Sequence, residues 1–171
     1  MIKPALNRRE EDRGAHIKDY WPLFVLVAVN ALAACAIGKS VDMTAGLMHY
    51  FMGFFLVSFA MLKLFNPSSF ADGFSMYDLL AKRVRAYAYI YPYIELGLGL
   101  GYLSSYEPQE IYLITVVVFS FGALGVFLAL RRGLDIDCPC MGTVLKVPLS
   151  TVTLTESLAM VAMAAWALLG L

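Results

Sequence analysis

Two cysteines separated by a single residue are the side chains of this 171-residue sequence whose chemistry is easiest to name. Cys138 and Cys140 flank Pro139, and Gly142 follows shortly after them. Their thiolates can bind a soft metal ion or form the disulfide of a small, strained ring. Pro139 favours an extended backbone at Cys138, and Gly142 permits a tight turn. The Cys-x-Cys pair alone leaves redox chemistry, metal binding and the simple packing of small thiols open.

Glu95 is the second candidate site residue, because it lies inside an apolar stretch. A carboxyl group within a membrane-spanning helix is costly, usually faces other helices and often marks a functional site. Burial favours the neutral acid unless a cation lies close, and Lys63 is the candidate cation. The alternative is a hydrogen bond or ion pair that only joins two helices. The candidate catalytic residues are therefore Cys138, Cys140 and Glu95, with Lys63 in support.

Several other residues are expected to be structural. Asn30 is expected to hydrogen-bond to a neighbouring helix, and Cys35 to pack as a small residue. His49, toward the outer end of the second span, is expected to be an interfacial residue rather than a metal ligand. Gly97 and Gly101 have the spacing that lets two helix backbones approach closely.

The amino-acid composition indicates what kind of secondary structure positions these residues. The sequence is 60% hydrophobic and 15% charged, with a mean hydropathy of +0.71. Soluble domains are roughly 45–50% apolar and about a quarter charged. We therefore predict an all-α integral membrane bundle of about five transmembrane helices, with the lipid bilayer as its surroundings. The formal net charge of zero gives no support for a nucleic-acid partner, and three cysteines are too few for a disulfide-stapled secreted scaffold.

Five apolar stretches define the predicted helices. A helix needs roughly 17–25 residues to cross about 30 Å of hydrocarbon, and none of these stretches shows the alternation of barrel strands. The first stretch is the shortest and carries Asn30, so a helix lying in the interface is the alternative there. The predicted spans are residues 21–37, 45–65, 86–106, 111–130 and 150–171.

The other segments complete the predicted organisation, in which residues 21–171 form the bundle. Residues 1–20 are predicted to be a charged arm, and a cleavable signal peptide is the alternative for the N-terminal part. Residues 66–85 are predicted to form an interfacial amphipathic connector, and residues 135–149 the Cys-x-Cys loop. Four tyrosines at the start of the third span are expected to form an interfacial belt: Tyr87, Tyr89, Tyr91 and Tyr93.

Arginine and lysine cluster in alternate connections, which predicts the orientation of the chain. Basic residues in short loops favour the cytoplasmic side of a membrane. We therefore expect a multi-pass protein of the cell inner membrane, with the N-terminus and the Cys-x-Cys loop in the cytoplasm and the C-terminus outside. The clusters are Lys3, Arg8, Arg9, Arg13 and Lys18, then Lys82, Arg83 and Arg85, then Arg131, Arg132 and Lys146.

Four stretches of the chain, in order, resemble the MauE/DoxX family of redox-associated membrane proteins. Family members typically carry K-L-x-D-P-x-x-F, P-x-x-E-L-x-L-G and C-x-C-F-G. Asn66 stands here in place of the usual Asp, and Met141 in place of the usual Phe. The likeness runs from about Gly46 to the C-terminus. The stretches are Lys63-Leu-Phe-Asn-Pro-Ser-Ser-Phe-Ala71, Tyr77-Asp-Leu-Leu80, Tyr91-Pro-Tyr-Ile-Glu-Leu-Gly-Leu-Gly99 and Cys138-Pro-Cys-Met-Gly142.

The resemblance implies a four-helix core, preceded here by an extra N-terminal helix, and a membrane thiol-disulfide redox component. Cys138 and Cys140 would then react with a partner protein or a quinone, as in the maturation of a disulfide-containing partner in methylamine metabolism. Transport or handling of a soft metal ion, Cu(I) or Hg(II), through the same thiols is the alternative, with a metal-donor protein as partner. An assembly role for another membrane protein is a third reading. Enzymatic activity, the choice between quinone and metal, and the oligomeric state stay open.

Overall fold

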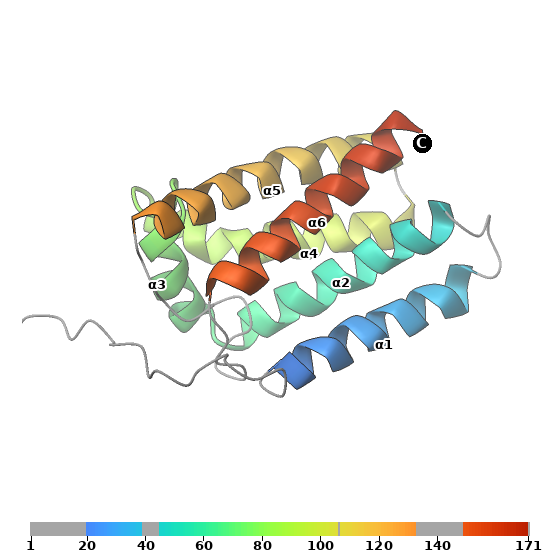
Figure 1. Ribbon diagram of the computed structural model, residues 1–171, viewed down its shortest axis with the longest axis horizontal. Helices are drawn as coiled ribbons and strands as arrows, with labels where there is room; N and C mark the ends of the chain where they lie inside the picture. The colour runs from blue at the N-terminus through green and yellow to red at the C-terminus, as the bar shows by residue number, and fades with distance from the viewer. Residues whose placement is uncertain (1–19, 39–44, 106, 133–148, 171) are drawn as a thin grey trace, which may run out of the picture.

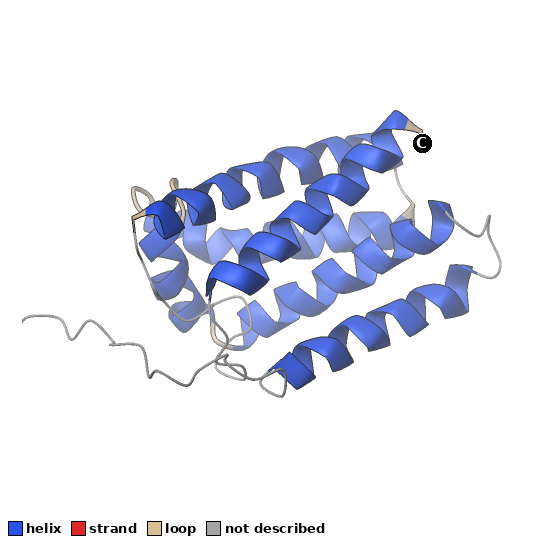
Figure 2. Cartoon of the chain, viewed as in Figure 1, coloured by secondary structure: helices blue, strands red, loops and turns tan. Residues whose placement is uncertain are grey.

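The computed structural model describes residues 20–38, 45–105, 107–132 and 149–170. These residues form six helices and, within the described ranges, no strand (Figure 2). This arrangement confirms the prediction of an all-α bundle. The helices are α1 (Trp21–Gly38), α2 (Ala45–Phe65), α3 (Pro67–Tyr77), α4 (Arg85–Ser104), α5 (Pro108–Arg131) and α6 (Leu149–Leu169).

The long helices have the length and surface of membrane helices. Among the described residues, Gly46–Phe65 of α2 and Pro108–Arg131 of α5 are each long and apolar enough to cross a bilayer. Trp21–Ile37 of α1 and Thr153–Leu169 of α6 are shorter apolar stretches. Large apolar side chains such as Phe24, Val117 and Leu124 face outward, as lipid contact requires. The chain is an integral membrane bundle of helices.

The five long helices run roughly side by side, and the short α3 closes one end (Figure 1). Helix α2 packs mainly along α4, α5 packs mainly along α6, and α1 packs on α2. Helix α3 lies where α2 ends, α4 begins, α5 ends and α6 begins (Figure 1). We call this the α3 end of the bundle.

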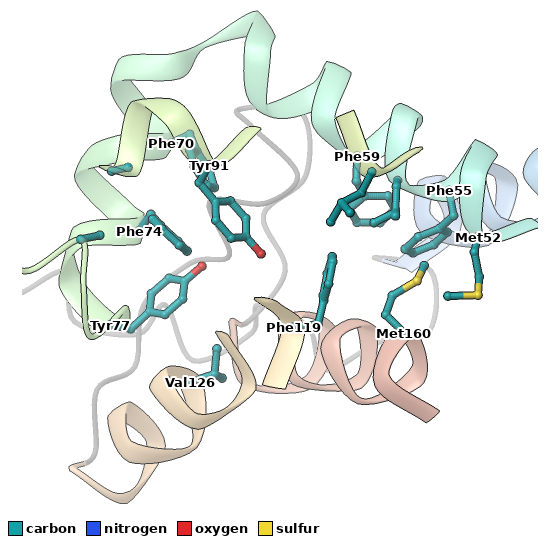
Figure 3. Close-up of a cluster of buried hydrophobic side chains, with 14 of the residues drawn as sticks. Met52, Phe55, Phe59, Phe70, Phe74, Tyr77, Tyr91, Phe119, Val126 and Met160 are labelled. Atoms are coloured by element: carbon teal, nitrogen blue, oxygen red, sulfur yellow. The ribbon is translucent and has the colours of Figure 1, made fainter. Parts of the chain in front are cut away.

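Aromatic and methionine side chains fill the space between the helices. Phe55 and Phe59 of α2 stack with ring centroids 4.3 Å apart. Phe119 of α5 and Met160 of α6 face them across the core (Figure 3). Close packing of this kind excludes water from the middle of the bundle.

Helix α3 is held in place by the residue that precedes it, Asn66, and by its own buried face. The side chain of Asn66 accepts a hydrogen bond from the backbone N–H of Ser69, 3.2 Å away, and caps the helix. Three buried aromatic residues, Phe70, Phe74 and Tyr77, turn toward the bundle. Phe74 lies with its ring centroid 4.6 Å from that of Tyr91 on α4. The amphipathic connector is therefore docked on the bundle by one face.

Asp78 shapes the turn from α3 into α4. Its Oδ1 atom accepts hydrogen bonds from the backbone N–H groups of Leu80, at 2.9 Å, and Ala81, at 2.8 Å. Burial raises the pKa of this carboxyl, and the two hydrogen bonds oppose that shift. Helix α5 comes close to the turn at Gly125, where an added Cβ would lie 3.3 Å from the carbonyl oxygen of Tyr77.

The close contact between α2 and α4 is made by Gly53 and Gly99. A Cβ built on Gly99 would lie 2.9 Å from the backbone nitrogen of Val57 and 3.1 Å from the carbonyl oxygen of Gly53. The expected helix contact through Gly97 and Gly101 is wrong. Gly97 has no atom within 4 Å of such a Cβ, and Gly101 meets only a side chain, because these two glycines do not face α2.

We predict that Gly99→Ala destabilises the bundle while Gly97→Ala does not. The alanine methyl at residue 99 must push apart two helix backbones, at a cost of about 1–3 kcal/mol, the usual range for overpacking. Residue 97 faces open space, so a methyl group there should be tolerated. Thermal unfolding of the two purified variants in the same detergent would compare them. Equal melting temperatures would contradict the Gly53–Gly99 contact.

Candidate functional site

A buried ion pair joins α2 to α4. The ammonium group of Lys63 donates hydrogen bonds to both carboxylate oxygens of Glu95. The two residues are 1% and 0% exposed, so water does not screen the pair. The cation that the sequence proposes for Glu95 is therefore its partner in the structure.

Aromatic rings surround the ammonium group. The Nζ atom of Lys63 lies 5.5 Å from the ring centroid of Tyr91, 5.7 Å from that of Phe70 and 5.9 Å from that of Phe59. Each distance is within the range of about 6 Å at which a ring face attracts a cation. Rings from three helices, α2, α3 and α4, thus stabilise the charge of Lys63.

A small cavity lies against the ion pair. Its volume is about 10 Å³, close to the minimum that a single water molecule needs. Tyr77 and Tyr91 turn their hydroxyl groups toward the same space (Figure 3). Helices α2 to α6 all contribute to the lining. The polar lining residues are Lys63, Tyr77, Tyr91, Glu95, Thr153, Glu156 and Ser157, and the apolar ones are Phe70, Phe74, Phe119, Gly122 and Val126.

Glu156 is a member of this site that the sequence analysis did not identify. It lies in the first half of α6, is 7% exposed and lines the cavity together with Thr153 and Ser157. The rule that singled out Glu95, an acidic residue within an apolar membrane segment, applies equally to Glu156.

Tyr91 is also a cavity residue rather than a member of an interfacial belt. It is 6% exposed and faces inward, whereas Tyr89 and Tyr93 of the same helix are exposed. The difference follows from helical geometry, since successive residues of α4 point in different directions around its axis. Only part of the expected tyrosine belt therefore faces outward.

The remaining candidate residues, Cys138, Pro139, Cys140 and Gly142, lie outside the described residues. The helices on either side of that segment end and begin at the same end of the bundle. Helix α5 ends at Arg131 and α6 begins at Leu149, both at the α3 end (Figure 1). In the part of the chain that the structure describes, His, Cys, Asp and Glu form no group of three suited to a metal ion.

A second polar cluster lies toward the opposite end of α2, α4 and α5. His49 Nδ1 lies 2.7 Å from the Tyr112 hydroxyl, and the Tyr102 hydroxyl donates to Thr115 Oγ1 at 3.0 Å. His49 is 7% exposed and lies in the first turns of α2, so it is enclosed by the bundle near one end. The histidine is buried because tyrosine rings of two neighbouring helices enclose it. These bonds connect the helices away from the cavity.

The two structural expectations for α1 have different outcomes. Ser58 of α2 donates a hydrogen bond to Asn30 Oδ1 at 2.9 Å, so Asn30 does link two helices. Cys35, by contrast, is exposed, and the expectation that it packs as a small residue is wrong. Helix α1 lies at the edge of the bundle and packs on α2 by one side, which leaves Cys35 facing outward.

Comparison with known proteins identifies a family. The profile of the family described as methylamine utilisation protein MauE matches residues 41–170, about three quarters of the chain. Neither the curated proteins nor the solved structures contain a significant match.

We predict that Lys63→Met destabilises the bundle strongly. Removal of the ammonium group leaves Glu95 buried without this cation, and loss of one partner of a buried pair typically costs about 3–5 kcal/mol. The control is Asp72→Asn, which breaks the pair between Arg85 and Asp72. Those side chains are 66% and 58% exposed, so we expect a loss below about 1 kcal/mol. Unfolding in mixed micelles would measure both, and comparable losses would contradict a structural role for the buried pair.

Proposed function

From the premise that this chain belongs to the methylamine utilisation protein MauE family, we propose that it is a membrane thiol-disulfide redox component. The family match carries this proposal, because the matched residues include the Cys138–Cys140 pair. The partner is a protein whose cysteines are oxidised or reduced, and a quinone is the alternative electron carrier. The chain is a membrane protein of a family associated with methylamine utilisation.

The proposed reaction is thiol-disulfide exchange. One thiolate of the Cys138–Cys140 pair attacks a sulfur of the partner's disulfide and releases the other partner sulfur as a thiolate. The second thiolate of the pair then attacks the mixed disulfide. This step releases the partner as a dithiol and leaves a disulfide between Cys138 and Cys140, so two electrons pass to the partner. The same steps run backwards when the partner is oxidised.

The arrangement of the helices supports a site at the α3 end. The helices on either side of Cys138 and Cys140, α5 and α6, end and begin at the α3 end of the bundle. The Lys63–Glu95 pair lies in the same half of the bundle. Glu95 follows Arg85, the first residue of α4, by ten positions, or about 15 Å along the axis. Pro139 and Gly142 shape the thiol segment in this proposal. Glu95 is the site residue inside the bundle, and Lys63 supports it by holding both of its oxygens.

We propose that the protein lies in the cell inner membrane and that its α3 end faces the cytoplasm. Five basic side chains near this end are exposed, and short cytoplasmic loops are enriched in arginine and lysine. The N-terminus would then be inside and the C-terminus outside. The residues are Lys82, Arg83, Arg85, Arg131 and Arg132.

The orientation can be tested with two single cysteines in a chain whose own three cysteines are serine. Ser69 lies on α3 and Ser104 at the far end of α4, and both are exposed. We expect Ser69→Cys to react with an impermeant maleimide only after the cytoplasmic side becomes accessible. Ser104→Cys should react in intact cells from which any outer membrane has been removed. Reaction of both residues from one side would contradict the proposed arrangement.

The thiol function can be tested by replacing each cysteine in turn. We expect Cys138→Ser and Cys140→Ser each to abolish the internal disulfide and the exchange reaction, since the step needs both sulfurs. The variant that keeps the attacking thiolate and lacks the resolving one should accumulate the partner as a mixed disulfide, which non-reducing electrophoresis and mass spectrometry would detect.

Cys35→Ser is the matched control. Cys35 is exposed on α1, so we expect its replacement to leave thiol-disulfide exchange unchanged. Loss of exchange in Cys35→Ser would contradict the proposed pair. Tight binding of Cu(I) or Hg(II) that needs both Cys138 and Cys140, without any mixed disulfide, would favour metal handling over redox exchange.

A further inference from the structure

We propose that the lipid-facing side of α5 binds an anionic phospholipid at the α3 end of the bundle. The phosphate is held by Arg131, and an acyl chain lies along the apolar side chains that precede it on the helix. Exposed residues of α5 and of the turn between α3 and α4 make up this surface. The binding needs neither the Cys138–Cys140 pair nor a particular orientation of the chain in the membrane.

One side of α5 is a line of exposed apolar side chains that ends in an arginine. Its members are Leu113, Val117, Leu124, Phe127 and, at the end, Arg131. Steps of three, four and seven residues separate them, and a helix with 3.6 residues per turn places such positions on one face. Val117 and Phe127 are ten residues apart, or about 15 Å, which is half of the roughly 30 Å of hydrocarbon in a bilayer. The line therefore matches the acyl region of one leaflet, with Arg131 at the level of the headgroup.

The side chain of Arg131 is held beside this apolar line. Its guanidinium carbon Cζ lies 4.6 Å from the ring centroid of Phe127, within the range of about 6 Å at which a ring face attracts a cation. Phe127 precedes Arg131 by one helical turn, so the contact folds the charged group back along the lipid-facing surface. Among the described residues, no acidic side chain pairs with Arg131. Its planar group can therefore bind a phosphate through two parallel hydrogen bonds.

Further positive charges lie around the same end of α5 (Figure 1). Arg132 is on the same side of the helix as Gly125, seven residues earlier. The turn after α3 touches that side, since a Cβ added at Gly125 would lie 3.4 Å from the Cα of Asp78. Lys82 and Arg83 belong to this turn, and both are exposed, as Arg132 is. These charges attract a negative headgroup and favour it over a zwitterionic one.

The combination of charge and apolar surface favours a lipid over a soluble anion. A free phosphate ion would use the charges alone, whereas the apolar line leading to Arg131 gives an acyl chain a surface to pack on. The opposite end of α5 carries the opposite charge, because Glu107 and Glu110 are exposed there. The two leaflets therefore meet different charges on one helix. An arginine at a helix C-terminus also offsets the helix dipole, and that role by itself would give no preference among lipids.

Quenching of tryptophan fluorescence by brominated lipids tests this surface. The full chain with Trp21→Phe and Trp166→Phe receives one reporter, Leu124→Trp, and is placed in vesicles of phosphatidylcholine and phosphatidylglycerol. Bromine atoms are carried on the acyl chains of one lipid or of the other. We expect phosphatidylglycerol to be favoured at this reporter by at least about fivefold, the attraction of one basic residue near the surface. Leu113→Trp, the matched reporter in the other leaflet, should show no preference for phosphatidylglycerol.

Substitutions at Arg131 identify the residue that holds the headgroup. Arg131→Gln should lower the preference at the Leu124→Trp reporter by about fivefold, whereas Arg131→Lys keeps the charge and should retain most of the preference. The control is Gln109→Glu, an exposed position at the opposite end of α5. It changes the net charge of the chain by the same amount and should leave the preference at that reporter unchanged.

Equal quenching by the two lipids at the Leu124→Trp reporter, or an unchanged preference in Arg131→Gln, would overturn the site. Quenching by neither lipid would mean that protein covers this side of α5, and would overturn it as well. Loss of the preference when inorganic phosphate is added at constant ionic strength would identify a soluble anion as the ligand instead of a lipid. Because these measurements need no thiol and no partner protein, their failure is separate from a failure of the redox proposal.

Discussion

The buried ion pair between Lys63 and Glu95 is the interaction on which the α3 end of this bundle depends. An ammonium group inside an apolar bundle is tolerated only with an opposite charge beside it, and both oxygens of Glu95 serve that need. The rings of Phe59, Phe70 and Tyr91 complete the surroundings of the cation. Because one of these rings belongs to α3, the pair also explains why an amphipathic connector is docked against the helices.

The Lys63–Glu95 ion pair and the Gly53–Gly99 contact join the same two helices, α2 and α4, at different positions along their axes. Gly53 and Gly99 bring the backbones of α2 and α4 together, whereas the longer side chains of Lys63 and Glu95 meet nearer the α3 end. Helix α5 also contacts α4, and α6 contacts α2. The polar lining of α6, with Glu156 at its centre, faces Glu95 across a space too small for more than about one water. Among the described residues, the buried lysine and carboxylic acid side chains thus lie toward the α3 end of the core.

This placement relates the proposed chemistry to the fold. Thiol-disulfide exchange proceeds through thiolates, so it involves the gain and loss of protons at sulfur. The helices that flank the thiol segment converge on the end of the bundle that holds the Lys63, Glu95 and Glu156 cluster. The apolar core between the cluster and the far end keeps the two sides separate.

The sequence by itself determined the class of the fold. It also identified one of the two carboxyl groups that line the cavity, Glu95, but not the other, Glu156. Long apolar stretches must be helical in lipid because every backbone amide needs a partner, and the same reasoning made Glu95 conspicuous and Lys63 its candidate cation. The ordered stretches also predicted the family, which the profile match over residues 41–170 confirms. Only the tertiary structure decided which faces of the helices meet. The faces of α4 and α6 placed Gly99 rather than Gly97 against α2, turned Tyr91 inward and brought Glu156 to the cavity of Glu95. Helix rotation depends on packing between residues far apart in the chain, and local pattern carries little information about it when most faces are apolar.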